Sequence, residues 1–156
     1  MPLQVYIAYG AAIDQVTALR LQALGAVNGL AVYVPPVFTR QEPTGQLDLQ
    51  SIERLHASDV VLGVVTVALS EACREELNSG KKMGKRTIVL ADPSQAGALA
   101  PYFPGHLVVF DPNDPAKAEQ SIVQFLRGSG LQRDAAKALL ALGTIALGLL
   151  IFAPQD

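Results

Sequence analysis

The chain has one cysteine, two histidines and few charged residues. The single cysteine, Cys73, excludes an internal disulfide and any metal site built from several thiolates, and it fits a reducing compartment. His56 and His106 lack acidic or thiol neighbours at the spacing of metal ligands, so we expect no metal site. Since the net charge is -2 and no dense stripe of Lys and Arg is present beyond Lys81, Lys82, Lys85 and Arg86, we expect no nucleic-acid partner.

Targeting and phosphate-binding motifs are also missing. The start, MPLQVYIAYG, lacks the charged region, long apolar run and cleavage site of a signal peptide, so we expect a cytoplasmic domain. The sequence contains neither GxGxxG nor a phosphate-binding loop. What it does contain is a large apolar fraction, 50% of 156 residues, which is enough for one domain with its own core.

Short β-branched runs alternate with longer helical patterns, which is typical of βαβ units and a parallel sheet covered on both faces. The runs predict five strands, at 4–9, 30–34, 60–65, 86–90 and 107–110. The helical patterns predict helices at 14–27, 47–58, 67–79 and 114–127. We interpret 37–45 as an exposed loop and 92–104 as a loop. The order predicts an α/β domain over residues 1–128, a flavodoxin-like three-layer fold with a five-stranded parallel sheet.

Two helices of this pattern carry features that bear on packing. In the first helix, the residues at helical spacing are Ile13, Val16, Arg20, Ala23, Leu24 and Val27. In the third, Gly80 is interpreted as the C-cap, with Lys81 and Lys82 beside the negative end of the helix.

Glu76 does not fit the pattern of its helix. It falls in the middle of an apolar arc formed by Leu69, Ala72, Cys73, Leu77 and Gly80. A carboxylate that points into an apolar face is costly unless it is paired, protonated or open to a cleft. The pattern leaves two interpretations open: a structural ion pair with a basic side chain such as Lys85 or Arg86, or a functional carboxylate.

The stretch from residue 57 to 90 resembles the region between the third and fourth strands of Toll/interleukin-1 receptor (TIR) domains, bacterial ones included. In that family a strand ends in Ser or Thr, a Ser follows, and a Cys-x-x-Glu-Leu helix leads to Gly-Lys and the next strand. The matching residues here are Thr66, Ser70, Cys73, Glu76, Leu77, Gly84 and Lys85. VYIAYGAAID resembles the family's first strand, with Tyr9 and Asp14 in matching places, and GLAVYV resembles its second.

The resemblance spans residues 5–127, and it departs from the family at Ala72, where a Trp is usual, and at Ala8 and Gly10, where serines are usual. It implies an NAD glycohydrolase that cleaves the nicotinamide-ribose bond, with Glu76 as the essential carboxylate and NAD as substrate rather than cofactor. The family logic is that of glycoside cleavage, which needs no metal. It also implies activation by self-assembly and a role as a bacterial stress or defence effector.

The resemblance implies further roles in nucleotide binding. Tyr9, Gly10, Thr66 and Ser70 would line the nucleotide. Phe38, in the loop after the second strand, would stack on it or close a site shared between neighbouring copies. Each also has an ordinary alternative: Tyr9 as packing at a strand end, Ser70 as a helix N-cap and Phe38 as a loop anchor.

Two other functions remain open. Nucleoside 2-deoxyribosyltransferases resemble the chain in VYIAYG and SDVVLGVV and carry a nucleophilic Glu on the same helix, so they also point to Glu76. The sequence lacks that family's Asp at the position of Thr66 and its Gly-Thr pair before the helix. The third hypothesis is a non-catalytic TIR-like scaffold, in which Glu76 is structural.

The last part of the chain, 129–156, differs from the rest in composition. An uninterrupted apolar run spans 138–153, with Arg127, Arg133 and Lys137 before it. A bilayer-spanning helix needs about 20 apolar residues, so this run is slightly short. Two interpretations stay open: an anchor that holds the cytoplasmic domain at the inner membrane, or a helix packed on the domain or on a second copy. In both we expect the tail to promote a homo-oligomer.

Overall fold

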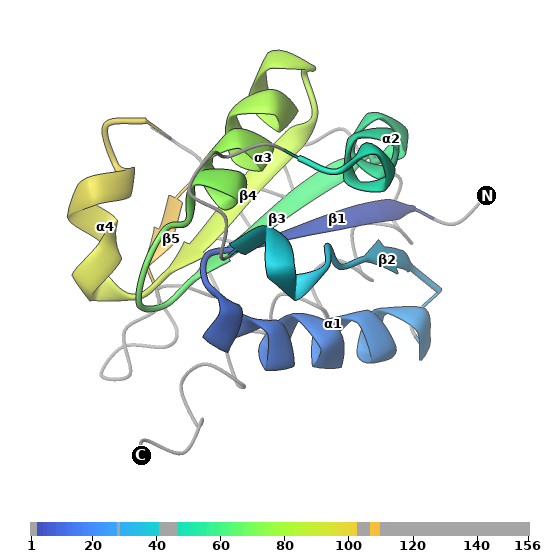
Figure 1. The fold of residues 1–156 in the computed structure, drawn as a ribbon, viewed down its shortest axis with the longest axis horizontal. Helices are drawn as coiled ribbons and strands as arrows, with labels where there is room; N and C mark the ends of the chain where they lie inside the picture. The colour runs from blue at the N-terminus through green and yellow to red at the C-terminus, as the bar shows by residue number, and fades with distance from the viewer. Residues whose placement is uncertain (1–2, 28, 41–46, 103–106, 110–156) are drawn as a thin grey trace.

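The computed structural model describes residues 3–27, 29–40, 47–102 and 107–109. Its core is a five-stranded parallel sheet with the order β2-β1-β3-β4-β5 (Figure 1). The strands are β1 (Gln4–Tyr9), β2 (Ala31–Tyr33), β3 (Val60–Val65), β4 (Arg86–Ala91) and β5 (Leu107–Val109). The helices are α1 (Gln15–Val27), α2 (Leu49–Ala57), α3 (Glu71–Lys82) and α4 (Pro93–Leu99), and two 3-10 turns are η1 (Ala12–Asp14) and η2 (Val37–Arg40). The predicted α/β class and parallel sheet are confirmed.

The strand order explains why helices cover both faces. The chain steps from β1 to β2 in one direction, and from β2 through β3 and β4 to β5 in the other. Because connections between parallel strands are right-handed, the first step places its helix on one face and the later steps place theirs on the other. In Figure 1, α1 accordingly lies on one side of the sheet, and α2 and α3 lie on the other. This layering agrees with the predicted flavodoxin-like fold.

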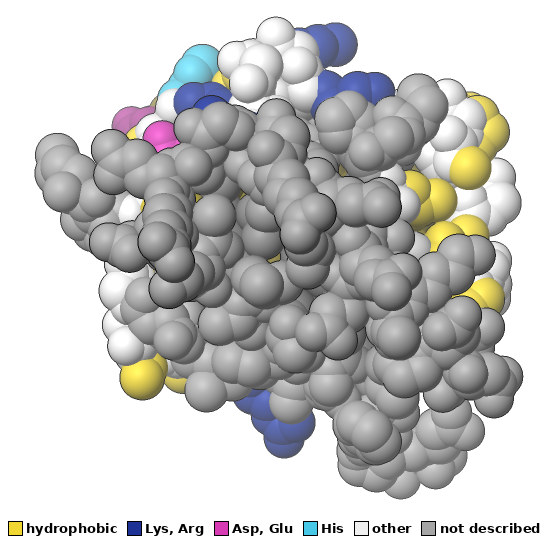
Figure 2. Space-filling view, turned by 180° about the vertical axis from the view of Figure 1, so that it is seen from behind, with side chains coloured by type: hydrophobic (Ala, Val, Ile, Leu, Met, Phe, Trp, Pro, Cys, Tyr) yellow, Lys and Arg dark blue, Asp and Glu magenta, His cyan; other side chains and the backbone are white. Residues whose placement is uncertain are grey.

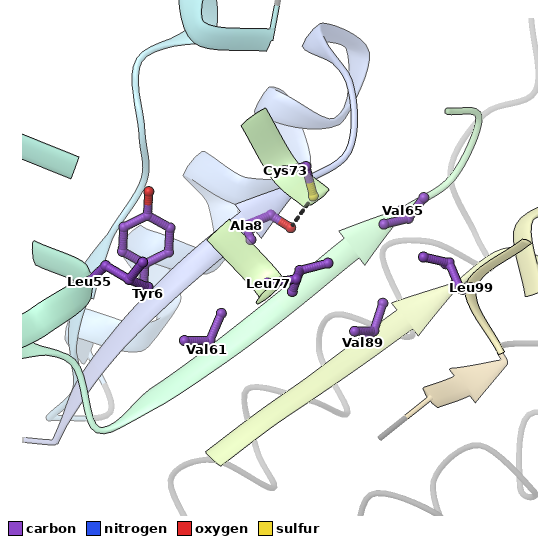
Figure 3. Close-up of a cluster of buried hydrophobic side chains, with 10 residues drawn as sticks. Tyr6, Ala8, Leu55, Val61, Val65, Cys73, Leu77, Val89 and Leu99 are labelled. Carbon is purple, nitrogen blue, oxygen red and sulfur yellow. Dashed lines mark hydrogen bonds between the residues drawn. The ribbon is translucent and has the colours of Figure 1, made fainter. Parts of the chain in front are cut away.

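The main core lies between the sheet and helices α2, α3 and α4. Figure 3 shows Val61 and Val65 of β3 and Val89 of β4 beside Leu77 of α3, with Leu99 of α4 at the edge of the cluster. All six residues of β3 are buried, as expected for a central strand without alternating polarity. The core therefore fixes α3, and with it Glu76, against the middle of the sheet.

The bounds of α3 differ from the prediction at both ends. The helix starts at Glu71 because the Ser70 side chain caps it, accepting a hydrogen bond from the Cys73 N–H at 3.2 Å. The Gly80 C-cap prediction is wrong, since Gly80 lies inside the helix, where an added Cβ would be 2.9 Å from Val61 Cγ2. Gly84, with φ +73°, is the glycine in the left-handed region beyond the helix end.

The basic residues expected at the end of α3 are present. Lys81 and Lys82 lie in its last turn, where positive charge stabilises the negative end of the helix dipole. Figure 2 shows Lys and Arg side chains gathered mainly at the top of the molecule, the end to which α3 runs in Figure 1.

Two loop predictions are wrong. Within 92–104 the chain forms α4, because Asp92 caps it, accepting from the Ser94 N–H at 2.9 Å, and Pro93 fits the first turn. The high Gly, Pro and Ala content of 92–104 is typical of a loop, so the prediction missed the helix start at Asp92 and Pro93. The loop 37–45 is not fully exposed either: Thr39 and Arg40 of η2 are buried, because Glu76 of α3 and the Tyr9 carbonyl of β1 supply partners for the Arg40 side chain. Residues 41–45 lie outside the described ranges.

The C-terminal predictions cannot be compared with this fold. The helix predicted at 114–127 and the apolar run 138–153 lie outside the described residues. Among the helices that the structure does describe, none is long and apolar enough to cross a membrane.

Two glycines in helices should respond in opposite ways to alanine. Gly80→Ala should lower the free energy of unfolding by about 1–3 kcal/mol, because the new methyl group overpacks against Val61. Gly97→Ala on α4, where a Cβ meets nothing within 4 Å, should raise it by about 0.5–1 kcal/mol through helix propensity. Urea unfolding of both variants measures the difference, and equal effects would contradict the packing of α3 on β3.

Candidate active site around Glu76

Glu76 is a buried carboxylate in a charged cluster. It lies on the second turn of α3, and its side chain is 0% exposed. Arg40 Nη2 donates to one carboxylate oxygen, and Arg40 Nη1 donates to the other at 3.1 Å. The Tyr6 hydroxyl, from the middle of β1, donates to that second oxygen. The ion pair considered from the sequence exists, but its cation is Arg40, while Lys85 donates to the His56 carbonyl at 2.7 Å.

The turn η2 delivers Arg40 to this position. After Pro35 and Pro36, Thr39 closes the turn, since its N–H and hydroxyl donate to the Pro36 carbonyl at 3.2 and 2.7 Å. Arg40 then reaches inward, where Nε donates to the Tyr9 carbonyl at 3.0 Å and Nη1 to the Thr39 hydroxyl at 2.9 Å. Every guanidinium nitrogen thus has an acceptor, which is what a buried cation requires.

The Tyr9 ring packs against the Arg40 guanidinium. Its ring centroid lies 4.1 Å from Arg40 Cζ, a cation–π geometry. Its hydroxyl donates to the Pro35 carbonyl at 2.7 Å, and the side chain is fully buried. Burial raises the pKa of Tyr9 to about 12, although Arg40 opposes the rise. Tyr9 therefore packs at the strand end, as its ordinary alternative supposed, and it also contacts the cation of the cluster.

In this cluster, burial and charge pairing act in opposite directions on the two ionisable partners, Glu76 and Arg40. Burial raises the pKa of Glu76, while the charge and hydrogen bonds of Arg40 and the hydrogen bond from Tyr6 oppose that rise. Burial alone would lower the pKa of Arg40, but Glu76 more than compensates and the net shift is upward. Because the guanidinium stays protonated, a neutral Glu76 would leave a buried cation unpaired. Ionised Glu76 beside Arg40 is the arrangement in which both charges are satisfied.

Gly10 and Ser70 join two turns at the carboxyl edge of the sheet. The Gly10 N–H donates to the Val64 carbonyl, and the Ser70 N–H donates to the Gly10 carbonyl, both at 2.8 Å. A Cβ on Gly10 would be 2.3 Å from the Ala68 carbonyl oxygen, so the turns touch directly. They follow β1 and β3, the strands between which the sheet order changes direction, where doubly wound sheets commonly bind ligands.

Thr66 and Phe38 have different surroundings. The Thr66 hydroxyl donates to the carboxylate of Asp14, which also accepts from the Thr66 N–H at 3.4 Å. Asp14 is buried, and burial raises its pKa while these hydrogen bonds oppose the rise. Phe38 lies on η2, two residues before Arg40, and is 53% exposed.

The structure thus brings part of the predicted site together. Tyr9 and Glu76 belong to one cluster through Arg40. Gly10, Thr66 and Ser70 lie in the two turns that follow β1 and β3 at the carboxyl edge of the sheet. Arg40 and Tyr6 are the members that the sequence did not indicate. Both lie in segments whose patterns predicted other roles, an exposed loop for Arg40 and plain strand packing for Tyr6. Among the described residues, no three His, Cys, Asp or Glu side chains form a metal-binding group.

The ion pair should be energetically coupled. Arg40→Met or Glu76→Gln alone should each cost about 3–5 kcal/mol of unfolding free energy, because each leaves an uncompensated buried charge. The double variant should lose less than the sum, which urea unfolding of the full cycle measures. As a matched control, Arg74→Met and Glu71→Gln remove a pair that is about half exposed (51% and 53%), and each should change stability by less than about 1 kcal/mol. Additive losses at Arg40 and Glu76 would contradict the pairing.

Cys73 should resist thiol reagents in the folded protein. Burial, and to a smaller degree the Glu76 carboxylate, raises the pKa of its thiol well above its usual range, so the thiol stays protonated. We expect iodoacetamide at pH 8 to label the native protein roughly a hundredfold more slowly than the protein in urea. Raising the pH from 7 to 9 should accelerate labelling in urea far more than in buffer. Equal rates in the two conditions would contradict the burial of α3.

Comparison of the chain with models of known protein families gives no match, and comparison with curated proteins gives no match either. The resemblance to TIR domains therefore depends on the motif residues of the sequence, above all on Cys73, Glu76 and Leu77.

Proposed function

We propose that the domain is an N-glycosidase that cleaves the nicotinamide-ribose bond of NAD, with Glu76 beside the anomeric carbon, and that the structure represents its closed state. The observation that supports this proposal most is the buried carboxylate of Glu76, which is paired with Arg40. It is buried at a helix position suited to an apolar side chain, and the Tyr6 hydroxyl and Arg40 hold it in place. Strongly perturbed, positioned carboxylates are frequent at active sites.

The chemistry requires little besides this carboxylate. As the bond between ribose and nicotinamide breaks, its electron pair goes to the ring nitrogen, and nicotinamide leaves as a neutral molecule. Ionised Glu76 would stabilise the positive charge that develops on the ribose, or bond to it transiently. Water then adds to the anomeric carbon and a proton is released. Tyr6, which donates to one carboxylate oxygen, would keep the other directed at the sugar.

The positive charge on the nicotinamide ring favours NAD over neutral nucleosides as the substrate. In the closed state a planar cation, the Arg40 guanidinium, contacts Glu76 and lies over the Tyr9 ring. The nicotinamide ring of NAD is also a planar cation. It would replace the guanidinium on both partners, so Glu76 would keep a counter-charge while the loop opens. A deoxynucleoside has no such charge, which makes the deoxyribosyltransferase alternative less suited to this site.

Opening would require the turn η2 to move, because Arg40 covers the carboxylate. Phe38 belongs to the same turn and is exposed, so a neighbouring copy that binds Phe38 would act directly on the segment that holds Arg40. This link supports activation by self-assembly. The domain would be inactive at low concentration and active when copies associate.

A non-catalytic scaffold is the second candidate. The complete pairing of Glu76 and Arg40 favours it, because a satisfied buried ion pair also serves to fix one loop conformation. In that case the pair would shape η2 for contacts between copies, and no substrate would displace Arg40.

The test measures nicotinamide released from NAD by concentrated protein. Wild type should release nicotinamide, and Glu76→Gln should reduce the rate at least about a hundredfold, because the charge opposite the developing cation is lost. The matched control Glu75→Gln, on an exposed neighbour of the same helix, should retain the wild-type rate. Deoxyinosine with adenine tests the transferase alternative in parallel.

Further variants keep the result interpretable. If Glu76→Gln does not fold, Arg40→Met/Glu76→Gln removes both charges and replaces it in the assay. Arg40→Met alone removes the cation that the substrate must displace from Glu76, so it should release nicotinamide at lower protein concentration than wild type. Folded proteins that release no nicotinamide, including Arg40→Met, would reject the glycosidase and leave the scaffold, while base exchange without nicotinamide release would establish the transferase.

A further inference from the structure

Helix α1 is apolar on the side that faces away from the sheet. Its inner side carries Ala18, Leu21 and Gly25, which are buried. Its outer side, continued from η1, exposes four large apolar residues: Ile13 (69%), Val16 (58%), Leu19 (44%) and Val27 (84%). We name these four residues the outer stripe. The spacing expected from the sequence thus exists, but most of its members point outward rather than to the sheet.

The outer stripe is unusual for a surface helix. Such a helix normally carries polar or charged residues opposite its buried face, whereas Arg20 is the only charged residue of α1. Large apolar side chains that gather on one exposed helix face mark a contact site. Figure 1 shows α1 as the outermost described element on its side of the sheet.

We propose that the apolar run 138–153 of the same chain packs as a helix along the outer stripe. The two lengths agree, since 16 residues of helix measure ~24 Å and the helical path from Ile13 to Val27 measures ~21 Å. The hydrocarbon core of a bilayer is ~30 Å thick, so the run fits α1 better than it fits a membrane. Both partners are apolar, and the run carries no charge that packing would bury.

The chain is long enough to make this contact. Residues 110–137 separate the end of β5 from the run. Even if 114–127 is helical, the 14 other residues of this connection reach ~46 Å when extended. This exceeds the ~30 Å breadth of a small domain, so the run can reach either face of the sheet.

A second copy of the chain suits the outer stripe less well. An antiparallel pair of α1 helices related by a two-fold axis near the helix centre would place Arg20 against Arg20 of the other copy. Like charges at such a contact are unfavourable. The run 138–153 allows Arg20 to extend past its edge into water instead. This inference goes beyond the proposed function and does not depend on it.

Photo-cross-linking of the full chain tests the contact. A benzophenone amino acid replaces Leu19 in the outer stripe or, as the matched control, Leu49 on α2, which is 71% exposed on the other side of the sheet. Protein labelled with heavy nitrogen is mixed with unlabelled protein, so that mass spectrometry separates links within a chain from links between chains. We expect position 19 to link to 138–153 of its own chain at least about fivefold more often than position 49, because packed side chains approach within ~4.5 Å.

Each other result would overturn the proposal. Links between chains would assign the outer stripe to an interface between copies. Links to lipid in vesicles of phosphatidylethanolamine and phosphatidylglycerol would assign it to a membrane surface. A linking rate to 138–153 no higher than from position 49 would leave the run without a place on α1. Substitution at Val16 repeats the measurement should the position-19 variant fail the circular-dichroism check of folding.

Discussion

The ion pair between Arg40 and Glu76 is the interaction on which the arrangement of this domain depends. It joins three segments that are distant in sequence: the turn after β2, the middle of α3 and, through Tyr6 and the Tyr9 carbonyl, strand β1. An unpaired charge in this position would be costly, so movement of the turn η2 away from Glu76 requires a replacement for its cation. The most polar contact of the core therefore determines the shape of the loop above it.

This dependence connects the structural and the catalytic interpretations of Glu76, which at first exclude one another. Under the proposed function, a carboxylate that is paired with Arg40 would also accept a planar cationic substrate, because the substrate would supply the same charge. The contacts that close the site are the contacts that a nicotinamide ring would use. Under the proposed function, burial of Glu76 beside Arg40 would thus be compatible with reactivity, provided that the cationic substrate fully replaces the guanidinium.

The sequence predicted the sheet well because burial on both faces leaves a strong local signal. The runs of β1 and β3 match the observed strands residue for residue, and Glu76 was recognised as a charge on an apolar face. Arg40 was not recognised, because its role depends on a partner 36 residues away, and loop composition contains no information on that partner. Gly80 was misread for a similar reason: its glycine serves close approach to Val61, a property of the packed sheet rather than of the helix.

Temperature should act on the closed site in an uncommon direction. Hydration of charged groups becomes less favourable as temperature rises, so the cost of keeping Arg40 and Glu76 out of water falls on warming. The apolar packing around α3 weakens on cooling, as apolar burial does generally. Both trends stabilise the contacts of the turn η2 with α3 on warming and weaken them on cooling. In these two terms, cooling rather than heating weakens the contacts that keep the Glu76 carboxylate away from solvent.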